Sequence, residues 1–251
     1  MFYKTHALVL KRHKLSDSDV ILTLFTRKMG KVRAVAKGAR NTRSKLASGS
    51  QPFVYGEYTI SKGKNLDKVT SIDIEESFYS IREDLTRLSY ASYFLELCDA
   101  VVQEGHGHNR LFNQILRTLK LITEVKSGYN IIRVAFELKL FQLTGVLPDL
   151  TRCMVCGKPM PTATIFLSIA EGGLVCGDCK PPDVELIEMD DTLIRLIDAL
   201  VYEDYKLIRT FKISRTLIKK LTWINEQYYQ YHISSKPLKS LAVLNSIPED
   251  V

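Results

Sequence analysis

The chain has 251 residues, of which 45% are hydrophobic and 25% charged, and its formal net charge is +7. These values are ordinary for a soluble globular protein and exclude a disordered or fibrous chain. No run of about 18 apolar residues predicts a membrane span, and the first residues lack the pattern of a signal peptide. We therefore expect a cytoplasmic protein in a reducing compartment.

The first 75 or so residues have the pattern of short strands. Segments rich in Val, Ile, Leu, Thr and aromatic residues alternate with turn residues and fall at 7–10, 20–25, 31–37, 53–61 and 67–74. Five short strands predict a small closed barrel, and the OB-fold is the five-stranded barrel most often used on nucleic acid. An SH3-like barrel fits the pattern nearly as well.

Five aromatic side chains of this region are candidates for stacking on nucleic-acid bases. Each is more simply interpreted as barrel core, but we expect at least one of them to be exposed. They are Tyr3, Phe25, Phe53, Tyr55 and Tyr58.

The excess positive charge belongs to the same region. Residues 1–80 hold 15 Lys and Arg against 7 Asp and Glu, whereas residues 81–251 hold 20 against 21. Period-two alternation places Lys31, Arg33 and Lys37 on one face of the third strand. The loop that follows adds Arg40, Arg43 and Lys45. A focused basic patch indicates a polyanionic partner, so we predict that these six cations contact a nucleic-acid backbone; the alternative is a solvated charged face.

After residue 80 the hydrophobic period becomes helical. Helices are predicted over 88–102, 111–122, 131–143, 190–202 and 214–232. Asn109 is the expected N-cap of the second, and Asp17 and Asp19 are interpreted as turn residues between two strands. The expected domains are an OB-fold at 1–80, a helical domain at 81–148 continued at 183–251, and a separate module at 149–182.

That module contains four cysteines in two pairs, Cys153 and Cys156, then Cys176 and Cys179. The spacing C-x2-C-x19-C-x2-C is typical of a structural zinc site, in which four thiolates surround one Zn²⁺. A thioredoxin-like redox pair or two disulfides are the alternatives. Four cysteine ligands leave no position for water or substrate, so chemistry at the metal is not expected.

Motifs of catalysis are missing from the sequence. It has no P-loop, G-x-G-x-x-G, H-E-x-x-H or G-x-S-x-G, and we predict no catalytic residue and no enzyme. The histidines of His106-Gly107-His108 are interpreted as part of a loop before a helix rather than as half of a metal site.

Taken in order, several segments resemble the RecO family of bacterial DNA repair proteins, over essentially the whole chain. The matching stretches are Leu24-Phe25-Thr26, Gly30-Lys31, Ala36-Lys37-Gly38-Ala39-Arg40, Gln51-Pro52-Phe53, Tyr93-Phe94-Leu95-Glu96-Leu97, Gly145-Val146-Leu147-Pro148 and Gly172-Gly173-Leu174-Val175-Cys176.

The resemblance implies an α+β multidomain protein: an N-terminal OB-fold, a helical domain and an embedded zinc module. It also implies a non-enzymatic, nucleoid-associated recombination mediator that binds single- and double-stranded DNA and anneals complementary strands. The implied partners are RecR, the C-terminal tail of single-stranded DNA-binding protein and in some cases RecF, and the implied outcome is RecA loading. An RNA-binding or transcription-associated protein and a protein-interaction scaffold remain the alternatives.

Overall fold

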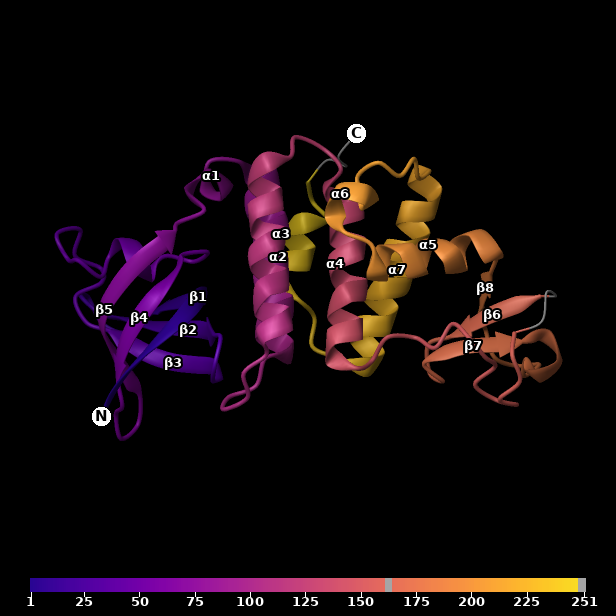
Figure 1. Cartoon of the computed structure of the whole chain (residues 1–251), viewed down its shortest axis with the longest axis horizontal. Coiled ribbons are helices and arrows are strands. Elements are labelled where there is room, and N and C mark those ends of the chain that lie inside the picture. The colour runs from indigo at the N-terminus through magenta and orange to yellow at the C-terminus, as the bar shows by residue number, and fades with distance from the viewer. Residues whose placement is uncertain (161–163, 248–251) are drawn as a thin grey trace. The chain divides into compact units, whose positions relative to one another are not determined.

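The computed structural model describes residues 1–160 and 164–247 (Figure 1). Contacts divide the chain into two compact units. Unit 1 contains residues 1–126 and the described C-terminal residues from 238 onward, and unit 2 contains residues 127–237. The helices are therefore divided between the two units.

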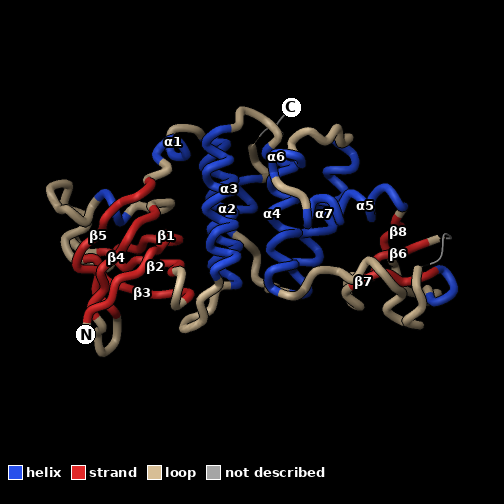
Figure 2. The backbone as a smooth tube through the Cα atoms, viewed as in Figure 1, coloured by secondary structure: helices blue, strands red, loops and turns tan. Residues whose placement is uncertain are grey.

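Unit 1 begins with a closed five-stranded barrel in the order β1-β2-β3-β5-β4 (Figure 2). This is an OB-like barrel, as predicted. Neighbouring strands of this barrel are antiparallel except β3 and β5, which pair in parallel. The strands are β1 Phe2–Lys14, β2 Val20–Thr26, β3 Gly30–Ala36, β4 Tyr55–Ser61 and β5 Asp67–Glu76.

The barrel closes around side chains that alternate along each strand, because successive residues of a strand face opposite sides. In β3, Ala34 and Ala36 are fully buried while Arg33 is exposed. The expected strand positions are confirmed, but β1 is much longer than the predicted 7–10. It extends because it pairs along its N-terminal half with β4 and along its C-terminal half with β2.

Helices complete unit 1: α2 and α3 contact the barrel, and α8 packs on α2. They are α1 Tyr79–Arg82, α2 Leu85–Val101, α3 Asn109–Glu124 and the C-terminal α8 Lys239–Leu244. Phe112 of α3 meets Phe25 of the barrel edge to face, with ring centroids 5.1 Å apart. His108, rather than the expected Asn109, is the N-cap of α3, and its Nδ1 accepts a hydrogen bond from the Leu111 N–H.

Two backbone hydrogen bonds, here called the backbone clasp, fix the barrel against the loop between α2 and α3. The Lys31 N–H donates to the Gln103 carbonyl at 2.9 Å, and the Gly105 N–H donates to Met29 at 2.9 Å. A Cβ atom on Gly30 would lie 2.1 Å from the Gln103 oxygen. Only glycine tolerates so close an approach of two backbones, so the strand β3 is held rigidly beside α2.

Unit 2 is built on α4 Tyr129–Thr144, α5 Asp191–Tyr202, α6 Tyr205–Ile208 and α7 Arg215–His232. A buried polar network joins α4 to α7. The Arg133 guanidinium donates to Glu137 at 2.8 Å and to Glu226 at 2.6 Å, and the Asn225 amide donates to Glu137 at 2.8 Å. Because each of these charges has a partner, the network fixes how the two helices lie against each other.

The cysteine segment of unit 2 forms a small antiparallel sheet in the order β7-β6-β8. Its strands are β6 Ile165–Ser168, β7 Gly173–Cys176 and β8 Ile187–Met189, and they were not predicted. They contain three or four residues each, too few for an alternation to be read from sequence. Within residues 1–160 and 164–247, the helices are all too short or too polar to cross a membrane.

Candidate nucleic-acid interface and metal site

The basic loop, residues 37–45, connects β3 toward β4 and carries four of the predicted DNA-binding residues. The side chains of Lys37, Arg40, Arg43 and Lys45 are exposed, as is Arg33 on the adjoining strand. Five of the six predicted cations are thus exposed, with Arg33 on β3 and the other four in the loop that follows this strand. Such an arrangement of guanidinium and ammonium groups is suited to phosphate oxygens.

The turn between β1 and β2 holds this loop in place. The Asp19 carboxylate accepts a hydrogen bond from the Gly38 N–H at 2.8 Å and another from the Ser18 hydroxyl at 3.0 Å. The Ser18 carbonyl in turn accepts from the Arg40 N–H at 3.0 Å. The hydrogen bond from the Gly38 N–H is the main reason that the pKa of Asp19 lies below its usual value. The carboxylate therefore stays ionised and keeps its hydrogen bond to the loop backbone.

Arg40 itself is partly committed to this turn. Its guanidinium donates to the Ser16 carbonyl at 3.0 Å and lies 3.9 Å from the Asp17 carboxylate. The side chains of Lys37, Arg43 and Lys45 are exposed beyond it. Arg40 therefore combines a role in the loop's shape with a charge that faces solvent.

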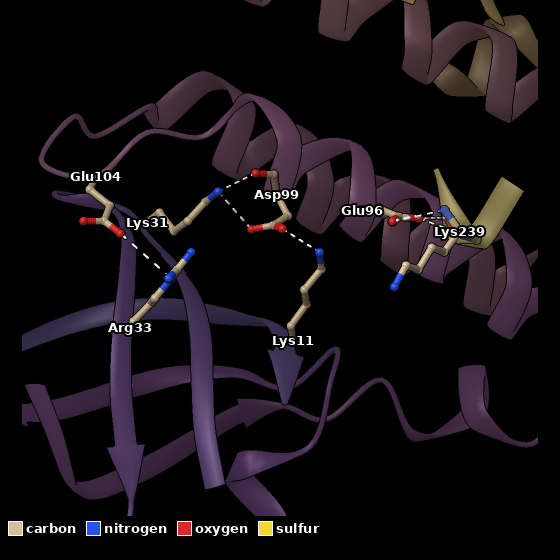
Figure 3. Close-up of polar contacts among 8 residues, drawn as sticks. Lys11, Lys31, Arg33, Glu96, Asp99, Glu104 and Lys239 are labelled. Atoms are coloured by element: carbon tan, nitrogen blue, oxygen red, sulfur yellow. Dashed lines mark hydrogen bonds and ion pairs between the residues drawn. The ribbon is translucent and has the colours of Figure 1, made fainter. Parts of the chain in front are cut away.

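Lys31 differs from the other five predicted residues. Only 16% of its side chain is exposed, and its Nζ lies 3.0 Å from Oδ1 of Asp99 on α2. It also donates to the Asp99 backbone carbonyl. Figure 3 shows Lys31 directed at Asp99, with Lys11 approaching the same carboxylate from β1.

Arg33, two residues along the same strand, remains available. Its side chain is 61% exposed, and its nearest acidic partner, Glu104, is 4.0 Å away (Figure 3). An exposed ion pair at this distance contributes little, so a phosphate group can displace it at small cost.

The five aromatic residues predicted as stacking candidates do not provide an exposed stacking surface. Phe25, Phe53 and Tyr58 are buried, and the Tyr58 hydroxyl donates to the Gly49 carbonyl at 2.8 Å. Tyr3 and Tyr55 are partly buried. The expectation that at least one of the five is exposed is wrong, because a barrel this small needs its large side chains for its core and for the contact with α3.

The second site is the cysteine cluster of unit 2. The four sulfur atoms of Cys153, Cys156, Cys176 and Cys179 lie within 4.8 Å of one another. The Sγ atoms of Cys156 and Cys176 are 4.0 Å apart, close to the ~3.8 Å edge of a tetrahedron with metal–sulfur bonds of ~2.3 Å. The residues therefore fit a four-coordinate metal ion.

The local backbone shapes the first cysteine pair and favours the thiolate form of Cys153. Gly157 takes a φ of 71° directly after Cys156, which turns the chain so that its N–H donates to the Cys153 carbonyl. Burial raises the pKa of Cys153, but the N–H groups of Cys156 and Cys176 outweigh it and lower that pKa to about 6. The thiolate is the form that binds a metal.

The interpretation of the two histidines in His106-Gly107-His108 is also tested by the geometry. His108 caps α3, and the His106 ring lies 3.1 Å from the Glu104 carbonyl, so this pair forms a loop before a helix as predicted. Sequence reasoning missed Asp99, Lys11 and the loop-holding role of Asp19. No local signal could have revealed the first two, because Asp99 is 68 positions from Lys31.

Comparison with known proteins covers nearly the whole chain. Residues 1–78 match the family described as Recombination protein O N terminal, and residues 82–242 match Recombination protein O C terminal. The chain is 38% identical over 247 residues to a protein of Alkaliphilus metalliredigens named DNA repair protein RecO, covering 98% of this chain and 100% of that one.

Proteins with the same name in other organisms are also similar. That of Desulforamulus reducens is 32% identical over 234 residues, covering 93% of this chain and 91% of the other. That of a Thermoanaerobacter species is 31% identical over 244 residues, covering 97% of each chain.

Proposed function

Since the chain belongs to the Recombination protein O (RecO) family of DNA repair proteins, we propose that it acts in repair as a non-enzymatic recombination mediator. In this role it binds single- and double-stranded DNA and anneals complementary strands. It helps to load RecA onto DNA covered by single-stranded DNA-binding protein, together with RecR and, in some settings, RecF. It works in the cytoplasm, at the chromosome.

The observation that carries this proposal is the exposure of the cations of Arg33 and of the basic loop that follows its strand. The cations of the loop are displayed by a backbone that Asp19 holds in one conformation. Phosphate contacts of this kind position a nucleic acid without reading its sequence. Annealing follows physically, because screening the repulsion between two strands while their bases stay exposed allows the bases to pair.

We leave Lys31 out of the proposed DNA surface. A phosphate at its ammonium group would have to replace a nearly buried carboxylate partner. The proposed contacts are therefore Arg33, Lys37, Arg40, Arg43 and Lys45.

The metal of the cysteine cluster is proposed to be one structural Zn²⁺. The support is chemical, because four thiolates in a closed tetrahedral set select zinc over harder cations. When bound, the ion supplies no chemistry beyond stabilising the fold of residues 149–182.

The test is equilibrium binding of a single-stranded DNA oligonucleotide at several salt concentrations. Five neutralised phosphates predict that log K falls with log salt with a slope of roughly −3.5. The double variant Lys37→Glu and Arg43→Glu should lose at least tenfold in affinity. These two positions test charge more directly than Arg40 does, because the Arg40 guanidinium also hydrogen-bonds to the Ser16 carbonyl and supports the loop.

The matched control is Lys64→Glu with Lys120→Glu, which makes the same change in net charge. Both side chains are exposed, and both residues lie outside the basic loop. Equal affinity of the two double variants would refute the assignment of the surface. An RNA of the same sequence that competes better than DNA would favour an RNA-binding protein instead.

A further inference from the structure

A second basic segment lies in unit 2. It is not apparent from the net charge of residues 81–251, because acidic residues elsewhere in that range balance it. Residues 205–237 contain seven Lys and Arg and one acidic residue, Glu226. Glu226 is already paired with the buried Arg133 at 2.6 Å. The positive charge of this segment is therefore not neutralised within it.

Part of this charge lies on one face of α7. Successive residues of a helix are rotated by about 100° around its axis. This rotation places three cations on the same side of α7 as Trp223 and Tyr231: Arg215, Lys219 and Lys220. The opposite side, with Leu221, Ile224, Asn225, Tyr228 and Tyr229, is buried. The outer stripe thus has cations over its first turns and aromatic rings over its last turns.

The aromatic part of the stripe borders a groove of about 640 Å³ between α7 and the segment leading into β8. Trp223 is 51% exposed and Tyr231 62% exposed. The groove is lined on α7 by Trp223, Gln227, Gln230 and Tyr231, and on the other side by Leu186 and Ile187. Rings with open faces beside amide side chains are suited to nucleic-acid bases, which stack on the rings and hydrogen-bond to the amides.

We propose that this surface of α7 is a second binding site for single-stranded DNA, separate from the barrel. Bases stack on Trp223 and Tyr231, and Arg215 and Lys219 contact the phosphates. The Lys220 ammonium donates to the Glu188 carbonyl at 2.7 Å and adds positive charge beside them. Charge favours this occupant, since the stripe carries three cations and the groove that it borders is lined by a single acidic residue, Glu185. The inference builds on the proposed DNA-binding function but assigns it to residues outside the barrel.

The sequence supplies its own reporter, because Trp223 is the sole tryptophan of the chain. The experiment titrates the full-length protein with a fluorescein-labelled oligo(dT), following anisotropy of the label and, with unlabelled oligo(dT), emission of Trp223. We expect emission to be quenched over the concentration range that saturates anisotropy. Unchanged emission at saturation would overturn the proposal.

Substitutions separate stacking from an indirect effect on the reporter. Trp223→Ala should weaken oligo(dT) binding about tenfold, because one base–aromatic stack is lost, and Trp223→Phe should restore it to within about twofold. The control is Tyr202→Ala on α5, an aromatic residue 64% exposed and outside the groove, which should leave affinity unchanged. An equal effect of Tyr202→Ala, or none of Trp223→Ala, would contradict the site.

Two further titrations identify the ligand of the groove and separate its binding from that of the barrel. An acidic peptide with an apolar C-terminus that quenches Trp223 when oligo(dT) does not would replace DNA by a peptide ligand. In the Lys37→Glu, Arg43→Glu variant, Trp223 should still be quenched at higher oligo(dT) concentration. If that variant binds normally, the barrel assignment fails while the α7 site stands, so the two failures are distinguishable.

Discussion

Lys31 Nζ lies 3.0 Å from Oδ1 of Asp99, while Lys11 Nζ lies 2.6 Å from Oδ2 of the same carboxylate. One acidic residue of α2 therefore holds a cation from β1 and another from β3. Together with the backbone clasp at Gly30, this pairing fixes the barrel on the helix. Lys31 therefore stabilises the fold, whereas Arg33, on the same strand, is exposed to solvent and free of a close ion pair.

This division of roles predicts opposite phenotypes for two neighbouring cations. Lys31→Met should lower the free energy of unfolding by about 1–2 kcal/mol, because it removes hydrogen bonds to a charged partner, and should change DNA affinity little. Arg33→Met should lower DNA affinity several-fold and change stability by less than about 1 kcal/mol. Urea denaturation and oligonucleotide binding measure both. A Lys31→Met protein of normal stability that binds DNA poorly would reverse the assignment.

The same carboxylate predicts a dependence of stability on pH. Burial raises the pKa of Asp99, but hydrogen bonds from Lys11 and Lys31 outweigh it, so the pKa in the folded protein lies below its usual value. A lowered folded pKa gives stability that is present above the unfolded value of about 4 and is lost as pH falls through the folded value. Wild type should therefore exceed Asp99→Asn in stability at neutral pH, and the difference should shrink below about pH 4. A constant difference down to pH 2 would exclude this carboxylate as its source.

Asp19 allows a test in which position and charge predict opposite signs. If only charge mattered, removing an acidic residue beside the basic loop would strengthen DNA binding. Because Asp19 anchors the Gly38 N–H, we expect Asp19→Ala to weaken binding several-fold, while Asp19→Asn, which keeps an acceptor, does not. Asp17→Ala is the control, since that side chain is 99% exposed and should follow the charge rule. Tighter binding by Asp19→Ala than by wild type would show that the anchor is unimportant.

The cysteine cluster predicts a stoichiometry of one zinc per chain. Cys153→Ser with Cys156→Ser should abolish zinc binding and destabilise unit 2, because a structural metal contributes directly to folding. Cys98→Ser is the matched control, as Cys98 is a buried thiol in the other unit. It should retain full metal content, measured by plasma emission spectrometry on purified protein. A wild-type protein with well under one zinc per chain would contradict the assignment.

Sequence reasoning succeeded where the physics is local. Alternation in 31–37 predicted the exposed Arg33 beside the buried Ala34, and the paired cysteines predicted their own cluster. The burial of Lys31 was not predicted, because a strand pattern identifies an outward face without showing that α2 covers part of it. The burial of the barrel aromatics was not predicted either, because it depends on how the barrel closes and on the contact with Phe112. The cations of α7 escaped notice because acidic residues elsewhere in 81–251 balance them in the total.

In the proposed function, the basic loop on the barrel drives strand annealing. The most direct test of this role is the rate at which two complementary oligonucleotides, each coated with single-stranded DNA-binding protein, anneal in the presence of this protein. We predict that wild type accelerates annealing, that Lys64→Glu with Lys120→Glu does so nearly as well, and that Lys37→Glu with Arg43→Glu loses at least tenfold in rate. Annealing at the wild-type rate by the loop variant would contradict the account.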